Sequence, residues 1–152
     1  MERGDRDQAA ELDELLANSP ASLQDRWFAR LYVIKPLAIG ALALFWIATG
    51  AIALGPGRAP SMAHLSEAGV RGALADIILI GGAVFDILLG LLLLWRRATR
   101  AVLITMLAVT PVYVLVGTLL APQLWADPLG PLTKIVPMLV ATLFTLAVLE
   151  ER

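Results

Sequence analysis

Residues 73–95 read ALADIILIGGAVFDILLGLLLLW, and this stretch decides the fold. Apart from two aspartates, every residue in it is apolar or a glycine. A helix needs about 20 such residues to cross the hydrocarbon core of a bilayer. The stretch therefore predicts a membrane-spanning helix that carries two acidic side chains.

One further apolar stretch precedes this one in the sequence, and two follow it. A glycine-proline-glycine turn at 55–57 ends the first stretch, and a basic turn at 96–100 separates the second from the third. The four predicted spans cover residues 36–54, 73–95, 101–121 and 132–149. Because the connections are short, neighbouring spans should run antiparallel. We predict an all-α fold, a four-transmembrane-helix up-down-up-down bundle with an N-terminal interfacial amphipathic helix.

The composition indicates a lipid bilayer as the surroundings of the chain. Of the 152 residues, 59% are hydrophobic, and the mean hydropathy is +0.77, whereas soluble proteins are roughly 45–50% apolar. The net charge of −1 gives no basic field for nucleic acid. Because it has no cysteine and one histidine, the chain cannot form disulfides, hold an iron–sulfur cluster or ligate haem through two histidines. We expect no metal site and no intrinsic cofactor.

The segment before the first span predicts a helix at the membrane surface. Residues 22–25, Ser-Leu-Gln-Asp, have the form of a capping box. An apolar stripe then lies opposite Arg26 and Arg30, as suits a helix in the headgroup region. Pro36 should end or kink this helix, because proline has no amide hydrogen. The predicted interfacial anchors are Trp27, Phe28, Arg30, Tyr32, Lys35 and, in the loop before the last span, Trp125.

The basic residues near the span ends predict the orientation. Seven lie on the side of the N-terminus and three on the opposite side, an asymmetry that places both termini in the cytoplasm. The expected organisation is an acidic cytoplasmic tail at 1–21, a membrane domain at 22–149 and a cytoplasmic C-terminus at 150–152. The first 20 residues hold six acidic and two basic side chains.

Asp86 is the most informative residue, because it lies near the middle of the second span. An ionised carboxylate at that depth costs about 2.5 to 3.5 kcal/mol, so we expect Asp86 to be buried and either hydrogen-bonded or protonated. Gly82 and Gly90 share its helix stripe and should let another helix approach. Counting along the other spans at 1.5 Å per residue places further polar side chains at the same level. The candidate ligand-binding residues are Asp86, Tyr113, Trp46, Thr110 and Thr142.

From the residues alone, the layer of polar side chains at the level of Asp86 can be interpreted in two ways. It could bind a polar headgroup such as a quinone, or hold a proton. It could equally be a hydrogen-bonded network that only fixes the register of the helices.

Three other polar side chains have more ordinary interpretations. Asp76 and Lys134 each lie within about one turn of the outer end of a span, so they predict a structural ion pair. His64 lies in the connector at 58–72, in a short helix expected from Ser61 to Gly69. Because no second ligand is near it in sequence, His64 is expected to be a helix-surface residue rather than a metal ligand.

Several motifs resemble the DoxX-like family of small four-helix membrane proteins. They are FARLY (28–32), KPL (35–37), FW (45–46), DILLG (86–90) and LWADPLGPL (124–132), the last followed by Lys134 and Pro137. The resemblance covers about residues 22–149. It implies a multi-pass protein of the bacterial cytoplasmic membrane that is associated with oxidoreductases, some of them linked to quinone chemistry.

The resemblance also suggests a partner. Residues 12–35 are similar to the junction at which some relatives are fused to an NAD(P)-binding short-chain-dehydrogenase-like domain. This chain has no glycine-rich dinucleotide fingerprint, so such an oxidoreductase would be a separate chain on the cytoplasmic side. We expect an accessory or anchoring subunit that is not catalytic alone, with a quinone-like pocket near mid-membrane. The alternatives are a small-molecule or proton-coupled transporter that uses Asp86 and a structural subunit of a larger membrane complex.

Overall fold

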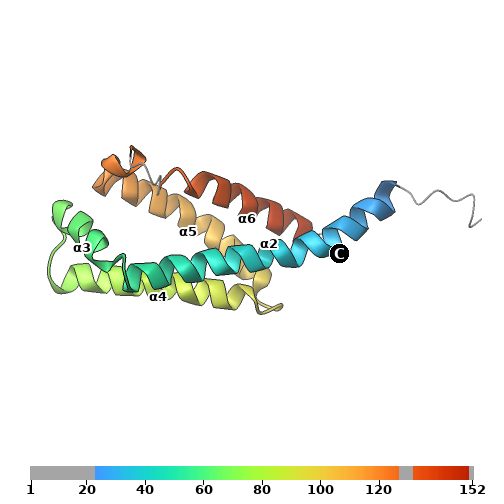
Figure 1. The fold of residues 1–152 in the computed structure, drawn as a ribbon, viewed down its shortest axis with the longest axis horizontal. Helices are drawn as coiled ribbons and strands as arrows, with labels where there is room; N and C mark the ends of the chain where they lie inside the picture. The colour runs from blue at the N-terminus through green and yellow to red at the C-terminus, as the bar shows by residue number, and fades with distance from the viewer. Residues whose placement is uncertain (1–22, 127–131, 151–152) are drawn as a thin grey trace, which may run out of the picture. The chain divides into compact units, whose positions relative to one another are not determined.

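The computed structural model describes residues 23–126 and 132–150, with the backbone alone for residues 23–31 and Glu150. The described residues are helices and their connections, without a strand, so the predicted all-α fold is confirmed. The helices are α2 (Leu23–Leu54), α3 (Arg58–Glu67), α4 (Ala73–Leu93), α5 (Thr99–Leu120), the short 3₁₀ helix η1 (Pro122–Trp125) and α6 (Ile135–Glu150) (Figure 1). The predicted tail at 1–21 and the last two residues lie outside the described part.

Three of these helices are long and apolar enough to cross a bilayer. The apolar segments are Tyr32–Leu54, Ala73–Leu93 and Thr99–Leu120. The fourth, α6, is apolar but has 16 residues, which span about 24 Å of a hydrocarbon core about 30 Å thick. Large apolar side chains are exposed along all four helices, as expected of surfaces that face lipid. The chain is therefore a multi-pass membrane protein.

Helices α3 and α6 each begin three residues or so from the predicted position, and a proline lies in the first turn of both. The connector helix α3 begins at Arg58, before the expected Ser61, and α6 begins at Ile135, after the expected position 132. In each helix the third residue is a proline, Pro60 or Pro137. The first turn of a helix tolerates proline because its amide hydrogens have no partner within the helix.

Of the two effects predicted for Pro36, an end of the first helix is wrong, whereas a kink stays a prediction. Helix α2 continues through this proline from Leu23 to Leu54, so residues 23–35 are not a separate helix. In an apolar environment a broken helix would leave backbone groups without water to bind, which favours continuation. Contacts divide the chain within this helix into two units, Met1–Ile34 and Lys35–Arg152. In the first unit, Tyr32 is 84% exposed.

The core of the second unit is packed between α2, α4 and α5. Its buried members are apolar side chains toward the end of the bundle at which α4 turns into α5. They are Leu42, Ala43, Trp46, Leu89, Leu93, Val102, Leu103 and Met106. Part of α6 packs against this cluster through Met138, Leu146 and Leu149.

Glycine lets α2 and α4 approach closely, and the two helices run side by side (Figure 1). A Cβ atom on Gly90 would lie 2.8 Å from the carbonyl oxygen of Ala43 and 2.6 Å from Cγ1 of Ile47. Gly50 faces the backbone of Ala83 in the same way. Gly82, expected on the contact stripe, instead faces open space. The sequence stripe therefore contains one contact glycine, Gly90, beside Asp86.

Hydrogen bonds hold the end of the unit at which α4 turns into α5. The Thr99 hydroxyl donates to the carbonyl oxygens of Leu93 and Trp95, each at 3.2 Å. Lys35 Nζ donates to the Val148 carbonyl oxygen at 2.9 Å. A cation near the C-terminus of a helix also interacts favourably with the helix dipole, so Lys35 caps the last turn of α6.

Candidate functional site

Asp86 is buried on α4, with 8% of its surface exposed. Its burial follows from the approach of α2 across Gly90, one turn further along the same face of α4. This confirms the expectation that the carboxyl points at protein rather than at lipid.

The partner of Asp86 is Tyr113 on α5. The Tyr113 hydroxyl donates to Oδ1 of Asp86 at 2.9 Å. The Tyr113 ring also lies beside the Trp46 ring of α2, with centroids 6.4 Å apart and planes inclined by 34°. Three helices therefore contribute neighbouring side chains at the level of Asp86, as predicted by counting residues along each span.

These side chains line a cavity of about 150 Å³. A cavity of this volume accommodates roughly one six-membered ring. We call it the Asp86 cavity, and its walls come from four helices. The lining residues are Phe45, Trp46, Thr49, Asp86, Thr110, Tyr113 and Ile135. The cavity lies on the side of the packed core that faces α3, away from the α4–α5 turn.

The hydrogen-bonding groups of the cavity are partly used within the protein. The hydroxyls of Thr49 and Thr110 donate to the carbonyl oxygens of Phe45 and Met106 on their own helices. Within the described residues, the Trp46 indole N–H and Oδ2 of Asp86 make no hydrogen bond. A ligand in the cavity could therefore meet one donor and one carboxyl oxygen.

The structure brings together four of the five predicted candidates. Asp86, Tyr113, Trp46 and Thr110 line the cavity, whereas Thr142 does not. The Thr142 hydroxyl donates to the Met138 carbonyl oxygen on its own helix at 2.8 Å. Depth fixes the level of a side chain in a bundle but not the direction in which it points, which explains why Thr142 does not line the cavity, and its role in ligand binding stays a prediction.

Sequence reasoning missed Phe45, Thr49 and Ile135 as lining residues. Phe45 was at the expected level, and Thr49 lies one helical turn beyond it on the same helix. Helical spacing could therefore have found Thr49. No sequence signal pointed to Ile135, because it reaches the cavity only through the late start of α6.

The predicted ion pair between Asp76 and Lys134 does not form. Asp76 instead accepts from Arg58 at 2.9 Å, and both side chains are about half exposed. Arg58 opens α3, and Asp76 lies in the first turn of α4, so the folded connector brings the two helix starts together. An acid in the first turn also complements the α4 dipole.

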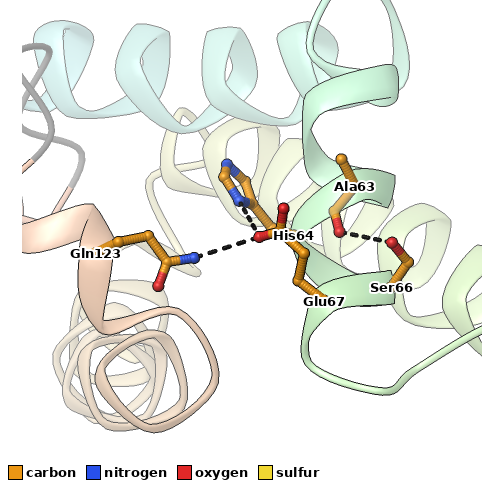
Figure 2. A network of polar contacts seen from close by, with 5 residues as sticks. All are labelled: Ala63, His64, Ser66, Glu67 and Gln123. Carbon is orange, nitrogen blue, oxygen red and sulfur yellow. Dashed lines mark hydrogen bonds and ion pairs between the residues drawn. The ribbon is translucent and has the colours of Figure 1, made fainter.

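His64 lies on α3 in a small polar cluster that connects this helix to η1 (Figure 2). Its Nδ1 is 3.7 Å from Oε2 of Glu67, and Nε2 of Gln123 lies 3.5 Å from the same oxygen. The Ser66 hydroxyl donates to the Ala63 carbonyl oxygen at 2.8 Å. His64 is therefore part of a contact between the connector and the segment that follows α5.

Among the predicted interfacial anchors, three have described side chains. Tyr32 and Trp125 are exposed, and the Trp125 indole donates to the Thr118 hydroxyl at 3.0 Å. Lys35 caps α6 through Val148. The side chains of Trp27, Phe28 and Arg30 lie outside the described part, and the interfacial role of all six residues stays a prediction.

A scan against protein families matches residues 43–143 to the DoxX-like family. This match covers more than half of the 152 residues. The chain belongs to the DoxX-like family. The matched region contains every residue that lines the Asp86 cavity, so the cavity lies wholly within the DoxX-like part. Searches of curated proteins and of solved structures gave no match.

In the described residues, no group of three or more His, Cys, Asp or Glu side chains is placed to hold a metal ion.

Proposed function

We propose that this DoxX-like protein is an integral membrane accessory or anchoring subunit of an oxidoreductase and that the Asp86 cavity binds a quinone-like headgroup. The hydrogen bond from Tyr113 to Asp86 at the wall of a ring-sized cavity carries the proposal. A buried carboxyl in a membrane span is a functional candidate because its cost in free energy needs compensation.

The cavity fits a neutral ring with polar substituents. Its volume of about 150 Å³ corresponds to one ring, and aromatic side chains provide flat apolar walls. The Trp46 N–H would donate to an oxygen on the ring of the ligand. A second polar substituent of the ligand would bind beside Asp86 and Tyr113. In this proposal the chain supplies the site, and the redox chemistry belongs to the ligand and a partner enzyme.

The partner in this proposal is an NAD(P)-binding oxidoreductase at the cytoplasmic face. Its support is the similarity of residues 12–35 to the junction of fused relatives. Purification in mild detergent, followed by mass spectrometry of co-eluting proteins and lipids, tests both parts of the proposal. Recovery of an oxidoreductase and a quinone is expected, and a chain that purifies repeatedly with neither would contradict the proposal.

Asp86→Asn tests whether the cavity is functional, with Asp76→Asn as the matched control. We expect the Asp86 variant to insert and fold but to lose the bound quinone or the activity of the partner. The Asp76 variant should retain both, because Asp76 lies outside the cavity in an exposed ion pair. Equal behaviour of the two variants would identify the Asp86 layer as purely structural.

A proton-coupled transporter is the second candidate, and the carboxyl that borders a cavity favours it. Flux of a solute or of protons into liposomes that contain only this protein would support transport. The accessory function requires a second protein and predicts no such flux.

The proposed location is the bacterial cytoplasmic membrane, with both termini in the cytoplasm. The excess of basic residues on the side of the termini supports this orientation. Reporter fusions after residue 152 and within residues 58–70 would test it. A periplasmic signal from the C-terminal fusion would overturn the orientation.

A further inference from the structure

The side chains around Asp86 have a composition that a neutral ligand does not require. Three aromatic residues, Phe45, Trp46 and Tyr113, line the cavity together with the carboxyl. The faces of aromatic rings attract cations, most strongly where water is excluded, and cages of aromatic side chains recognise quaternary ammonium ions. Carboxylate and aromatic faces thus favour the same sign of charge in a ligand.

The Asp86 carboxyl has no basic side chain beside it in the cavity. None of the residues that line the cavity is a lysine, arginine or histidine, and the hydrogen bond that Asp86 accepts comes from a neutral phenol. Acidic groups inside membranes pair with a cation or take up a proton. In this cavity the cation would have to come from a ligand.

The outer wall of the cavity gives such a ligand a way in. Phe45 and Tyr113 are each 37% exposed, and Thr49 is exposed as well, whereas Trp46 and Asp86 on the inner side are buried. A ligand that enters past the exposed residues would meet the carboxyl at the buried side. This gradient from an uncharged entrance to a carboxyl at the buried end suits an amphiphilic cation.

We propose that the Asp86 cavity binds a small organic cation, a tertiary or quaternary ammonium ion whose charged head is held by the Asp86 carboxylate and the three rings. The cavity volume of about 150 Å³ limits the ligand to a head of roughly the size of one ring. A bare metal ion would gain little, because the walls offer few oxygen ligands. This inference goes beyond the proposed function and does not rest on a quinone or on a partner enzyme.

Choline and its neutral isostere 3,3-dimethyl-1-butanol provide the matched probes. The two molecules have nearly the same shape and differ in charge. The full chain in lipid nanodiscs would be titrated with each, and binding would be followed by calorimetry and by the NMR signal of the Trp46 indole N–H, identified with a Trp46→Phe variant. Choline should bind and shift this signal, and the isostere should bind at least about tenfold more weakly, because it lacks the charge.

Two pairs of variants separate the charge from the rings. Asp86→Asn should weaken choline binding at least about tenfold, whereas Asp76→Asn, which changes an exposed carboxylate outside the cavity, should leave it unchanged. Phe45→Leu should weaken it about two- to fivefold through the loss of one ring. Phe144→Leu is its control, because Phe144 is exposed on α6 and does not line the cavity. Phe45 is itself partly exposed, so its variant remains informative if Asp86→Asn does not fold.

Three outcomes would overturn the proposal. They are equal binding of choline and the isostere, no choline binding at the highest concentration tested, and unchanged choline binding in both cavity variants. A protein that binds quinone but, once freed of it, does not bind choline would refute the cation site and leave the proposed function standing. The reverse result would refute the quinone pocket alone.

Discussion

Helix α4 carries two aspartates whose surroundings differ in every respect. Asp76, in the first turn, is about half exposed and pairs with the charged Arg58. Asp86, ten residues further along, is buried and accepts from the neutral Tyr113. At 1.5 Å per residue the two lie about 15 Å apart along the helix.

The difference shows that the depth of a carboxylate in the membrane determines which contacts can stabilise it. Near the end of a span, water and an exposed arginine stabilise Asp76, and either partner can be lost at small cost. Deep in the span, Asp86 is buried beside the close approach of α2 at Gly90, so it depends on few specific contacts. A buried polar group with few alternatives is the place at which a ligand has most to contribute.

Gly90→Val would break this comparison most strongly. The added side chain would overlap the Ala43 carbonyl and Ile47, so α2 could not approach and the burial of Asp86 would be lost. We expect the free energy of unfolding to fall by about 3 kcal/mol or more. Unfolding in mixed micelles with increasing SDS, followed by circular dichroism, measures the change.

Gly82→Val is the control for this prediction. Gly82 lies on the same helix and faces open space, so the substitution should change the free energy of unfolding by less than about 0.5 kcal/mol, slightly in favour of valine, because glycine has the lower helix propensity. If both valine variants lost the same stability, the close approach of α2 would not be what buries Asp86.

Tyr113→Phe has the next largest expected effect, because it leaves the buried carboxyl without its protein partner. Removal of one partner of a buried hydrogen bond costs about 1 to 3 kcal/mol. Tyr32→Phe should change stability by less than about 0.5 kcal/mol, because Tyr32 is exposed and makes no described hydrogen bond.

A double variant gives this second prediction a sharper test. Tyr113→Phe combined with Asp86→Leu should recover much of the lost stability, because apolar groups then replace both partners. Recovery would show that the cost lies in the unpaired carboxyl. Its failure would show that Asp86 is stabilised by contacts other than the Tyr113 hydroxyl.

The Arg58–Asp76 pair should show the smallest effect. A double-mutant cycle with Arg58→Ala and Asp76→Asn should give a coupling of about 0.2 to 1 kcal/mol, because both side chains are about half exposed. The coupling should decrease in high salt. The same cycle with Lys134→Met in place of Arg58→Ala should give no coupling, and a larger value there would revive the pairing that the sequence suggested.

The apolar runs of the sequence, and the glycines, prolines and charged residues between them, were enough to predict that the helices exist. Long apolar runs defined α4 and α5 to within two residues at each end, because the charged turn at 96–100 and the polar connector before residue 73 bound them. The starts of α3 and α6 were missed although Pro60 and Pro137 signal them, since each proline is tolerated in a first turn. Continuation of α2 through Pro36 was one of two predicted outcomes, because local preference alone does not decide whether a proline ends a helix or lies within it.

The candidate site was predicted to the extent that depth determines it. Asp86, Trp46 and Tyr113 were found because they lie at one level, and the contact of Asp86 with Tyr113 is confirmed. Rotation of each helix about its axis is set by packing between helices, so Thr142 does not line the cavity and Ile135, which does, was missed. The partner of Asp76 was predicted as Lys134 instead of Arg58 for a related reason. The position of the connector helix, which carries Arg58, cannot be obtained by counting along the spans.

The length of α6 has a consequence for the surrounding bilayer. Its 16 residues are about 6 Å shorter than a typical hydrocarbon core. A short span is accommodated by local thinning of the membrane, at a cost of fractions of a kcal/mol per Å of mismatch. Ile135, the first residue of α6, lines the Asp86 cavity, so the thinned lipid would lie next to the ligand site. Occupancy of the cavity should therefore respond to the acyl-chain length of the lipids, with thin bilayers matching α6 best.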